Sequence, residues 1–217
     1  SVEDGRAADV IHAQAKRLGV DLIVVGSRGH GTLESMLLGS TSSEVVDHAS
    51  VPVLVARART IGSVVFAYDG SGCAEDAAAF LIGSGIFADA RIHVLSIADA
   101  APTHWTDMGL TGTDPAAGSF SPAAEPSRSQ HQQLARSMVE RLQTAGLDGR
   151  PERRDGDPAE QIVRAADTHG AGLILVGTHG RTGLRRLLLG SVARNVLHHA
   201  HCSVLVVHSR PATEAAA

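Results

Sequence analysis

Residues 5–56 of this chain are repeated as residues 156–207. The two segments align without a gap at a constant offset of 151, and 21 of the 52 aligned positions are identical. Identity of this extent at a fixed offset indicates that one structural unit has been duplicated. In each copy a helical pattern alternates with a short apolar run, so we expect the chain to fold as repeated α/β units.

Helix signals are clear at the start of the second copy. Asp157 suits an N-cap, Pro158 suits the first helical position, and Glu160 stands where the acid of a capping box belongs. These residues predict a helix over 158–169, and Gly170 is placed to end it. The repeated unit therefore opens with a well-capped helix.

Strands and helices alternate through residues 61–208. The continuous apolar run LILVG is typical of a strand that is covered on both faces of a parallel sheet. We expect strands at 63–71, 91–99, 150–155, 173–177 and 204–207, and helices at 74–87, 131–146, 158–169 and 191–200. This order predicts an α/β fold with a doubly wound, Rossmann-like, five-stranded parallel sheet, in which 150–155 is a polar edge strand.

The first copy lacks the elements that precede the second copy. Residues 61–208 are expected to form a complete domain, whereas residues 1–58 match the C-terminal half of one. We therefore expect a fragment of a longer tandem protein, short by roughly 80–100 residues. The strand predicted at 22–26 would then have an open edge, and a second copy of the chain is the simplest element to cover it.

Composition and charge argue against several classes of partner and location. Nineteen basic and 23 acidic residues give a formal net charge of −4 and a pI near 6.3, without a basic run, so we expect no nucleic-acid partner. The sequence has no apolar run of about 18 residues and no signal-peptide pattern at SVEDGRAADV, so we expect a cytoplasmic protein without a membrane anchor. Residues 100–128 are rich in Pro, Gly, Ser and Ala and are expected to be a flexible loop, and 209–217 a disordered tail.

Lysine and cysteine usage excludes further classes of site. Lys16 is the single lysine, so a P-loop, a kinase-type strand lysine and an SxxK nucleophile are absent. Cys73 and Cys202 have no spacing motif and indicate neither a disulfide framework nor a zinc site. Any phosphate must therefore be held by amides, hydroxyls, His or Arg.

Glycines follow one strand of each copy at identical spacing. The pattern G-x2-G-x9-G-[ST] occurs as Gly26, Gly29, Gly39 and Ser40, and again as Gly177, Gly180, Gly190 and Ser191. A turn without Cβ atoms at the end of a strand lets backbone amides face a ligand. The third glycine opens a helix, whose N–H groups and dipole favour anions. The pattern predicts a phosphate cradle; the alternative is a fold that keeps its glycines without a ligand.

The segment VGTHGRTGLRRLLLGS at 176–191 resembles the ATP-binding branch of the universal stress protein family. The resemblance covers 61–208 completely and 1–58 as a C-terminal half, which is similar to a tandem-domain type with a truncated first domain. It implies the strand order 3-2-1-4-5, with ATP across the carboxyl ends of the strands. It also implies that strands 53–56 and 203–208 pair antiparallel, within one chain or between the chains of a homodimer.

The resemblance also implies a role for each matched residue. Residues placed at adenine and ribose are Tyr68, Asp69, Gly70, Ser71, Ile97, Val176 and Gly177. Residues placed around the phosphates are Thr178, His179, Gly180, Arg181, Gly190, Ser191 and Val192. The first copy keeps a vestigial or partner-completed phosphate half-site, namely Gly26, Ser27, Arg28, Gly29, Gly39, Ser40 and Thr41. Because its adenine half is missing, we expect one competent site per chain.

Three details qualify this interpretation. Ala193 stands where ATP-binding relatives often carry a hydroxyl, so one phosphate or metal-linked contact is missing. Asp69 has a second interpretation as the cap of the helix that begins near Ser71. The histidine-rich group His198, His199, His201, Cys202 and His208 has no recognised tetrahedral spacing. We therefore expect no metal held by the protein itself, and Mg²⁺ solely through a nucleotide.

The leading hypothesis is a stress-response regulatory protein whose conformation or partners change when ATP, ADP or AMP binds. The family resemblance implies ATP together with Mg²⁺. A slow ATPase or autophosphorylating enzyme is the alternative, with Ser191 or a nearby Thr as acceptor and Asp69, His179 and Arg181 as candidate groups. A nucleotide-independent dimerising scaffold is the second alternative. The sequence contains no evident set of nucleophile, base and acid, so we assign no catalytic residue.

Overall fold

The computed structural model describes residues 4–27, 38–58, 60–98, 128–180 and 189–208. The helices in this part of the chain are α1 (Ala7–Leu18), α2 (Ser40–His48), α3 (Gly72–Gly83), α5 (Arg128–Thr144), α6 (Pro158–Thr168) and α7 (Ser191–His199). The strands are β1 (Ile23–Gly26), β2 (Val53–Ala56), β3 (Ser63–Ala67), β4 (Arg91–Ala98), β5 (Asp148–Asp155), β6 (Leu173–Gly177) and β7 (Ser203–Val207).

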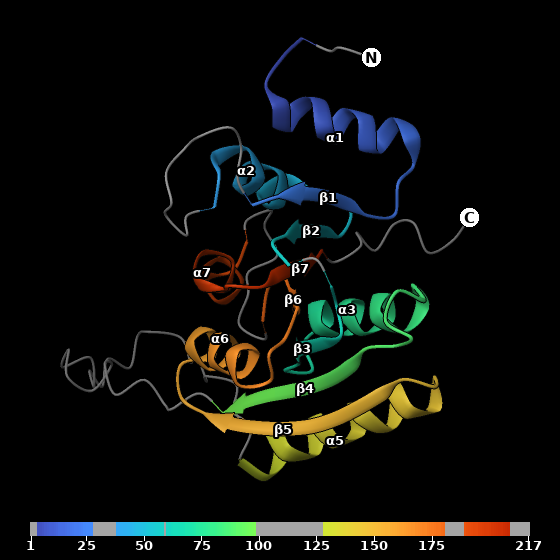
Figure 1. The fold of residues 1–217 in the computed structure, drawn as a ribbon, viewed down its shortest axis with the longest axis vertical. Helices are drawn as coiled ribbons and strands as arrows, with labels where there is room; N and C mark the ends of the chain where they lie inside the picture. Colours follow the sequence, from blue (N-terminus) through green and yellow to red (C-terminus); the bar gives the residue numbers. More distant parts are fainter. Residues whose placement is uncertain (1–3, 28–37, 59, 99–127, 181–188, 209–217) are drawn as a thin grey trace, which may run out of the picture.

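All of these strands form one sheet in the order β1-β2-β7-β6-β3-β4-β5, which Figure 1 follows from top to bottom. The run β5-β4-β3-β6-β7 is parallel throughout and corresponds to the order 3-2-1-4-5 over residues 61–208. The prediction of a five-stranded parallel sheet is therefore correct in part, because these five strands belong to a larger sheet. The sheet continues past β7, because β2 adds to that edge antiparallel and β1 adds to β2 parallel. The result is a mixed, seven-stranded sheet.

The pairing of β2 with β7 is symmetric with respect to the repeat. Leu54 lies opposite Leu205, its own equivalent at an offset of 151. Side chains repeat the symmetry on either side of the pair: Arg57 Nη2 donates to the Leu197 carbonyl at 2.7 Å, and its repeat equivalent His208 places Nε2 2.8 Å from the Val46 carbonyl. The two copies therefore pair within one chain. Pairing within one chain was one of the two arrangements expected, and pairing between the chains of a homodimer was the other.

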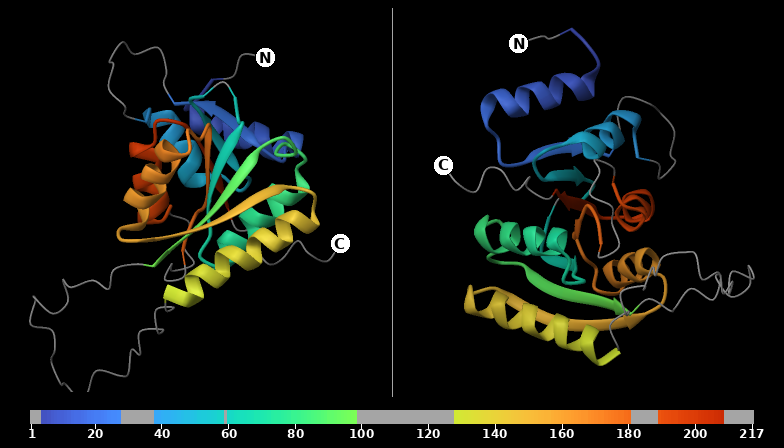
Figure 2. Two further views of the ribbon diagram at one scale, coloured as in Figure 1. Left: turned by 60° about the horizontal axis from the view of Figure 1, so that its bottom comes forward. Right: turned by 180° about the vertical axis from the view of Figure 1, so that it is seen from behind.

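Helices cover the sheet on both sides. One core contains side chains from α1, α2, α6 and α7, and the other contains side chains from α3 and α5. The left view of Figure 2 shows α2, α6 and α7 on one face of the sheet and α3 and α5 on the other. Strand β6 contributes buried residues to both cores, as its continuous apolar run predicts.

Several element boundaries differ from those predicted. The predicted helix 74–87 ends at Gly83, and Gly85 follows in a left-handed conformation with φ of 67°, which stops the helix. The helix predicted from residue 131 begins at Arg128, so the predicted loop 100–128 is wrong in its last residue. The remainder of that loop and the predicted tail 209–217 lie outside the described residues. Strand β5 lies at the end of the sheet, as expected of a polar edge strand.

None of the helices in the described part of the chain has both the length and the apolar composition of a membrane-spanning segment.

Candidate functional site

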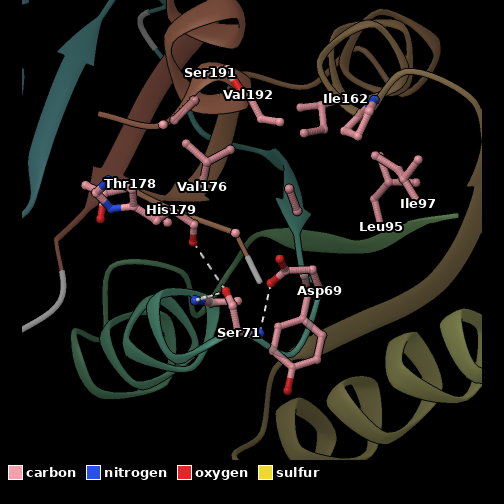
Figure 3. A pocket seen from close by; sticks show the side chains of 18 of the residues that line it. Asp69, Ser71, Leu95, Ile97, Ile162, Val176, Thr178, His179, Ser191 and Val192 are labelled. Atoms are coloured by element: carbon pink, nitrogen blue, oxygen red, sulfur yellow. Dashed lines mark hydrogen bonds between the residues drawn. The ribbon is translucent and has the colours of Figure 1, made fainter. Parts of the chain in front are cut away.

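A cavity of about 320 Å³ lies at the carboxyl ends of β3, β4 and β6. This is the edge at which doubly wound sheets bind ligands, because the strand ends and the helix N-termini that follow them converge there. The residues that the sequence analysis placed at the site and that line the cavity are Tyr68, Asp69, Ser71, Ile97, Val176, Gly177, Thr178, His179, Gly180, Gly190, Ser191 and Val192. Figure 3 shows how several of these side chains surround it.

Gly70, which was predicted at the site, is not among the described residues that line the cavity. Gly70 makes the turn between β3 and α3 with φ of 75°, and its Cα faces Leu134, whose side chain would lie 3.2 Å from an added Cβ. Its role is therefore in the turn. Arg181 lies outside the described residues.

The turn after β3 holds Asp69 against the start of α3. Asp69 Oδ1 accepts a hydrogen bond of 2.9 Å from the Ser71 amide, and Ser71 Oγ accepts one of 3.2 Å from the Ala74 amide (Figure 3). The N-cap of α3 is therefore Ser71, which corrects the interpretation of Asp69 as the cap. Ser71 Oγ also donates to the His179 carbonyl at 3.4 Å, which ties this turn to the turn after β6.

The glycines of the second copy allow close packing around the cavity. A Cβ on Gly177 would lie 2.8 Å from Cys73 Cβ, and one on Gly190 would lie 2.8 Å from the Thr178 carbonyl oxygen. A Cβ on Gly180 would lie 3.0 Å from Asp69 Oδ2. Gly177 and Gly190 are therefore required by close packing of the fold, whereas a side chain at position 180 would meet the Asp69 carboxylate.

Three helices begin at the cavity, and their N-termini differ in capping. Asp157 caps α6 by accepting from the Glu160 amide at 2.8 Å, and Ser71 caps α3. Helix α7 follows Gly190 and has no side-chain cap among the described residues. Since the first amides of a helix have no partner within it, the α7 N-terminus is the best placed of the three to accept an anion.

Sequence reasoning missed several residues of the cavity wall. Leu95 lies two residues before Ile97 on the same face of β4, a signal that strand periodicity provides. Pro158 and Ile162 come from the first turns of α6, and the capping signal at Asp157 marked the position of that helix. The other missed lining residues are Ala67, Ala74 and His131, and Ala193, which the sequence marked as a departure from the family, lines the cavity as well.

His131 reaches the cavity from α5. It is 3% exposed, and its Nδ1 lies 3.0 Å from Ser96 Oγ. Residues 99–127 separate this helix from β4 in the sequence, and the helical period of α5 alone does not indicate which edge of the sheet the helix approaches. The cavity therefore contains one buried imidazole that the motif search did not find.

The hydroxyl of Tyr68 is held by groups on α3 and α5. It donates to Glu75 Oε1, and Arg141 Nη1 lies 3.0 Å from the same carboxylate oxygen. Burial, together with the hydrogen bond to the Glu75 carboxylate, raises the pKa of Tyr68 to about 12. Tyr68 is therefore neutral at physiological pH, and its hydroxyl serves packing between the two helices.

The first copy repeats the backbone geometry of the cradle. The Gly39 amide donates to the Ser27 carbonyl at 3.0 Å, as the Gly190 amide donates to the Thr178 carbonyl at 2.8 Å. Helix α2 likewise follows its glycine without a side-chain cap among the described residues. Ser40 and Thr41 begin α2, whereas Arg28 and Gly29 lie outside the described residues. The described residues that line the cavity all come from 67–193, so the described part of the first copy contributes none.

Fold and cavity together define a doubly wound α/β protein with a glycine-bordered ligand site at the carboxyl edge of its sheet. The model of the universal stress protein family matches residues 1–57 and 60–208. The chain therefore belongs to the universal stress protein family.

Individual relatives agree with this assignment. The universal stress protein MJ0531 of Methanocaldococcus jannaschii is 35% identical over 66% of this chain and 80% of its own length. Universal stress protein Slr1230 of Synechocystis is 29% identical over 85% of this chain, which spans 57% of the Synechocystis protein. A crystal structure of a functionally unknown protein from Pseudomonas aeruginosa, PA1789, has a TM-score of 0.66 at 20% identity, covering 96% of this chain and 69% of that one, and shows the same fold.

Proposed function

We propose that the cavity binds one adenine nucleotide per chain, ATP with Mg²⁺ in the leading form, and that occupancy regulates the conformation or partners of a cytoplasmic stress protein. The competent site lies in the domain formed by residues 61–208, and residues 1–58 carry the phosphate half of a second site. The observation that carries this proposal is the N-terminus of α7, which no side chain of the described residues caps and which lies at a cavity bordered by Gly177, Gly180 and Gly190.

The cavity has two ends of different chemistry. Leu95, Ile97 and Ile162 form an apolar side suited to a flat base, whereas Ser191 and the start of α7 form a polar side suited to phosphate. The carboxylate of Asp69 lies between β3 and the turn after β6, where it is suited to accept hydrogen bonds from ribose hydroxyls. This arrangement supports a nucleotide better than an isolated phosphate ion.

Mg²⁺ fits this proposal as a partner of the phosphates, whose charge it would reduce next to the Asp69 carboxylate. The cavity residues would hold the nucleotide through backbone amides and hydroxyls. We therefore assign no metal ligand of the protein to Mg²⁺.

Helix α7 provides a route from the cavity to the other copy. It begins at the cavity with Ser191, and one turn later Arg194 Nη2 lies 2.9 Å from Asp47 Oδ1 on α2. Arg57, just after β2, donates to the Leu197 carbonyl near the end of α7. A ligand present at about 100 times its Kd stabilises the form that it binds by about 2.7 kcal/mol, which is enough to shift an equilibrium at this contact.

A matched pair of serines tests the site. Ser191 and Ser40 are repeat equivalents, and both are exposed, so neither Ser→Ala change should affect folding. Calorimetric titration with ATP and Mg²⁺ should show about one site per chain. Ser191→Ala should weaken binding by about tenfold through loss of one hydrogen bond to a charged ligand, and Ser40→Ala should leave binding unchanged.

Mass spectrometry of material released from the freshly purified, denatured protein identifies the natural nucleotide. Absence of both released nucleotide and heat at millimolar ATP would reject the proposal and favour a dimerising scaffold. Equal losses in Ser191→Ala and Ser40→Ala would reject the assignment of the site to the second copy. Sustained phosphate release that is lost in Asp69→Ala would favour the enzymatic alternative.

A further inference from the structure

Three chemically active side chains meet on the sheet outside the cavity. His93 lies on β4, Glu152 lies on β5, and His169 is the C-cap residue of α6. Their ligand atoms all lie within 4.8 Å of one another, and each side chain is partly buried. The three residues, called here the His93 cluster, are separated by 59 and 17 positions, so the tertiary fold alone brings them together.

Contacts within the His93 cluster are close. The rings of His93 and His169 stack with centroids 3.7 Å apart and planes 13° from parallel. His169 Nε2 lies 2.6 Å from Glu152 Oε2. Two imidazoles and one carboxylate thus place their ligand atoms close together at a partly open surface.

We propose that His93, Glu152 and His169 bind a divalent transition-metal ion of the Zn²⁺ class, with water completing the coordination. Two His nitrogens and a carboxylate oxygen are a ligand set that Zn²⁺ accepts, at bond lengths of about 2.0–2.2 Å. Two ligand atoms on one tetrahedral ion then lie about 3.3 Å apart. The ion requires Glu152 Oε2 and His169 Nε2 to separate slightly and the stacked rings to turn toward each other.

The surroundings of Glu152 support this role. Arg154 Nε donates to Glu152 Oε1 at 2.6 Å, which orients the carboxylate and leaves Oε2 directed to the histidines. Partners of this kind fix the geometry of metal-binding carboxylates and affect metal affinity. The positive charge of Arg154 opposes the binding of a cation. Near His93, the positive charge of Arg91 is offset by the negative charge of Asp148 on β5.

An ion at this position would connect three elements. It would join the C-terminal end of α6 to β4 and β5, while Pro158 and Ile162 at the other end of α6 line the cavity. We expect the ion to restrain α6 against the sheet and to raise the melting temperature of the protein. This site differs from the histidine-rich end of α7, which the sequence analysis considered and set aside, and it does not depend on nucleotide binding.

Titration of the full chain, free of any affinity tag and nucleotide, with Zn²⁺ tests the proposal. We expect one tight equivalent by calorimetry, a rise in melting temperature, and with Co²⁺ the visible absorption of a tetrahedral or five-coordinate site. His93→Ala should lower the affinity by more than about tenfold. The matched control is His201→Ala, which removes an exposed histidine from the turn before β7 and should change nothing.

Glu152→Gln provides a second variant with nearly the same shape, in case His93→Ala fails to fold. Circular dichroism of the metal-free proteins shows whether each variant is folded. Absence of binding at millimolar Zn²⁺ would overturn the proposal. So would unchanged stoichiometry and affinity in folded Glu152→Gln, or an equal loss in His201→Ala, because either result would assign the ion to other histidines among the 12 of the chain.

Discussion

The two copies place the same strand, turn and helix in different surroundings. Val24 in β1 and Leu175 in β6 are repeat equivalents, yet Val24 is 59% exposed and Leu175 is fully buried. Leu175 belongs to the core that includes side chains of α3 and α5, while the described residues leave Val24 open to solvent. Equivalent residues therefore differ in burial because their neighbours differ.

The local geometry of the cradle is nevertheless the same in both copies. Gly39 and Gly190 make equivalent hydrogen bonds and precede equivalent helices, whether or not the strand in front of them is covered. The cavity of the second copy additionally needs β3, β4, α3 and α6, which surround the same turn. Duplication of the cradle sequence thus reproduces the same turn, and the neighbouring elements determine whether that turn lines a cavity.

The largest difference between the copies should be in the stability lost when an equivalent strand residue is shortened to alanine. Leu175→Ala should reduce the free energy of unfolding by about 2–5 kcal/mol, because it removes buried side-chain atoms and leaves a cavity. Val24→Ala, at the equivalent position, should change it by less than about 0.5 kcal/mol. Urea unfolding followed by circular dichroism measures both. Similar losses in the two variants would mean that β1 is covered in solution, for example by a second chain.

The second largest difference should be in the effect of replacing the glycine that precedes α2 or α7 by alanine. An alanine Cβ at position 190 would lie 2.8 Å from the Thr178 carbonyl oxygen, whereas one at 39 would lie 3.6 Å from the Ser27 carbonyl oxygen. Gly190→Ala should therefore cost about 1–3 kcal/mol through overpacking and weaken nucleotide binding, and Gly39→Ala should be tolerated. Urea midpoints and ATP titration would detect this. A stable, fully binding Gly190→Ala would show that the turn relaxes more readily than its contacts suggest.

The two copies differ by one hydroxyl group at the position two residues after the cradle serine. Ser42 Oγ donates to the Gly26 carbonyl at 2.7 Å, and the equivalent residue in the second copy is Ala193. Ser42→Ala should cost about 0.5–1.5 kcal/mol through loss of this bond. Ala193→Ser should form the corresponding bond to Gly177 and leave ATP affinity nearly unchanged. Markedly tighter ATP binding by Ala193→Ser would instead assign the missing hydroxyl to the phosphates.

The smallest difference should be a pH effect at the pair Arg57 and His208. Burial lowers the pKa of His208, and its Nδ1 is buried without a hydrogen-bond partner among the described residues. The folded state therefore favours the neutral ring, and its contribution to stability is complete above about pH 6.5, the ordinary pKa of histidine. This contribution is lost as the pH falls through the lowered pKa, because the unfolded chain binds the proton more readily.

His208→Gln keeps a donor for the Val46 carbonyl and removes the titration. Its urea midpoint should fall less than that of the natural protein between pH 7.5 and about pH 5. Parallel midpoints in the two proteins would contradict the prediction and assign the acid sensitivity to other histidines.

Much of the second copy was predictable from its sequence. The caps at Asp157 and Gly170, the apolar run of β6 and the glycine pattern each specify backbone conformation within a few residues. That pattern indicated Gly177, Gly190 and Ser191 at the cavity, whereas Val176 and Val192 were implied by the family resemblance. The strand order was implied by the family resemblance, and the antiparallel addition of β2 to β7 within one chain was one of two arrangements that the sequence left open.

The sequence by itself determined the repeat, the capped helices, the buried strands and the glycine turns, because these depend on dihedral preferences and hydrogen bonds between near neighbours. Tertiary structure decided which apolar strand edges pair, which helix reaches the cavity with His131, and that His93, Glu152 and His169 meet. These outcomes depend on sheet register and on helix placement across tens of residues. These contacts join segments that are distant in the sequence, so no short segment determines them and they are established only in the folded chain.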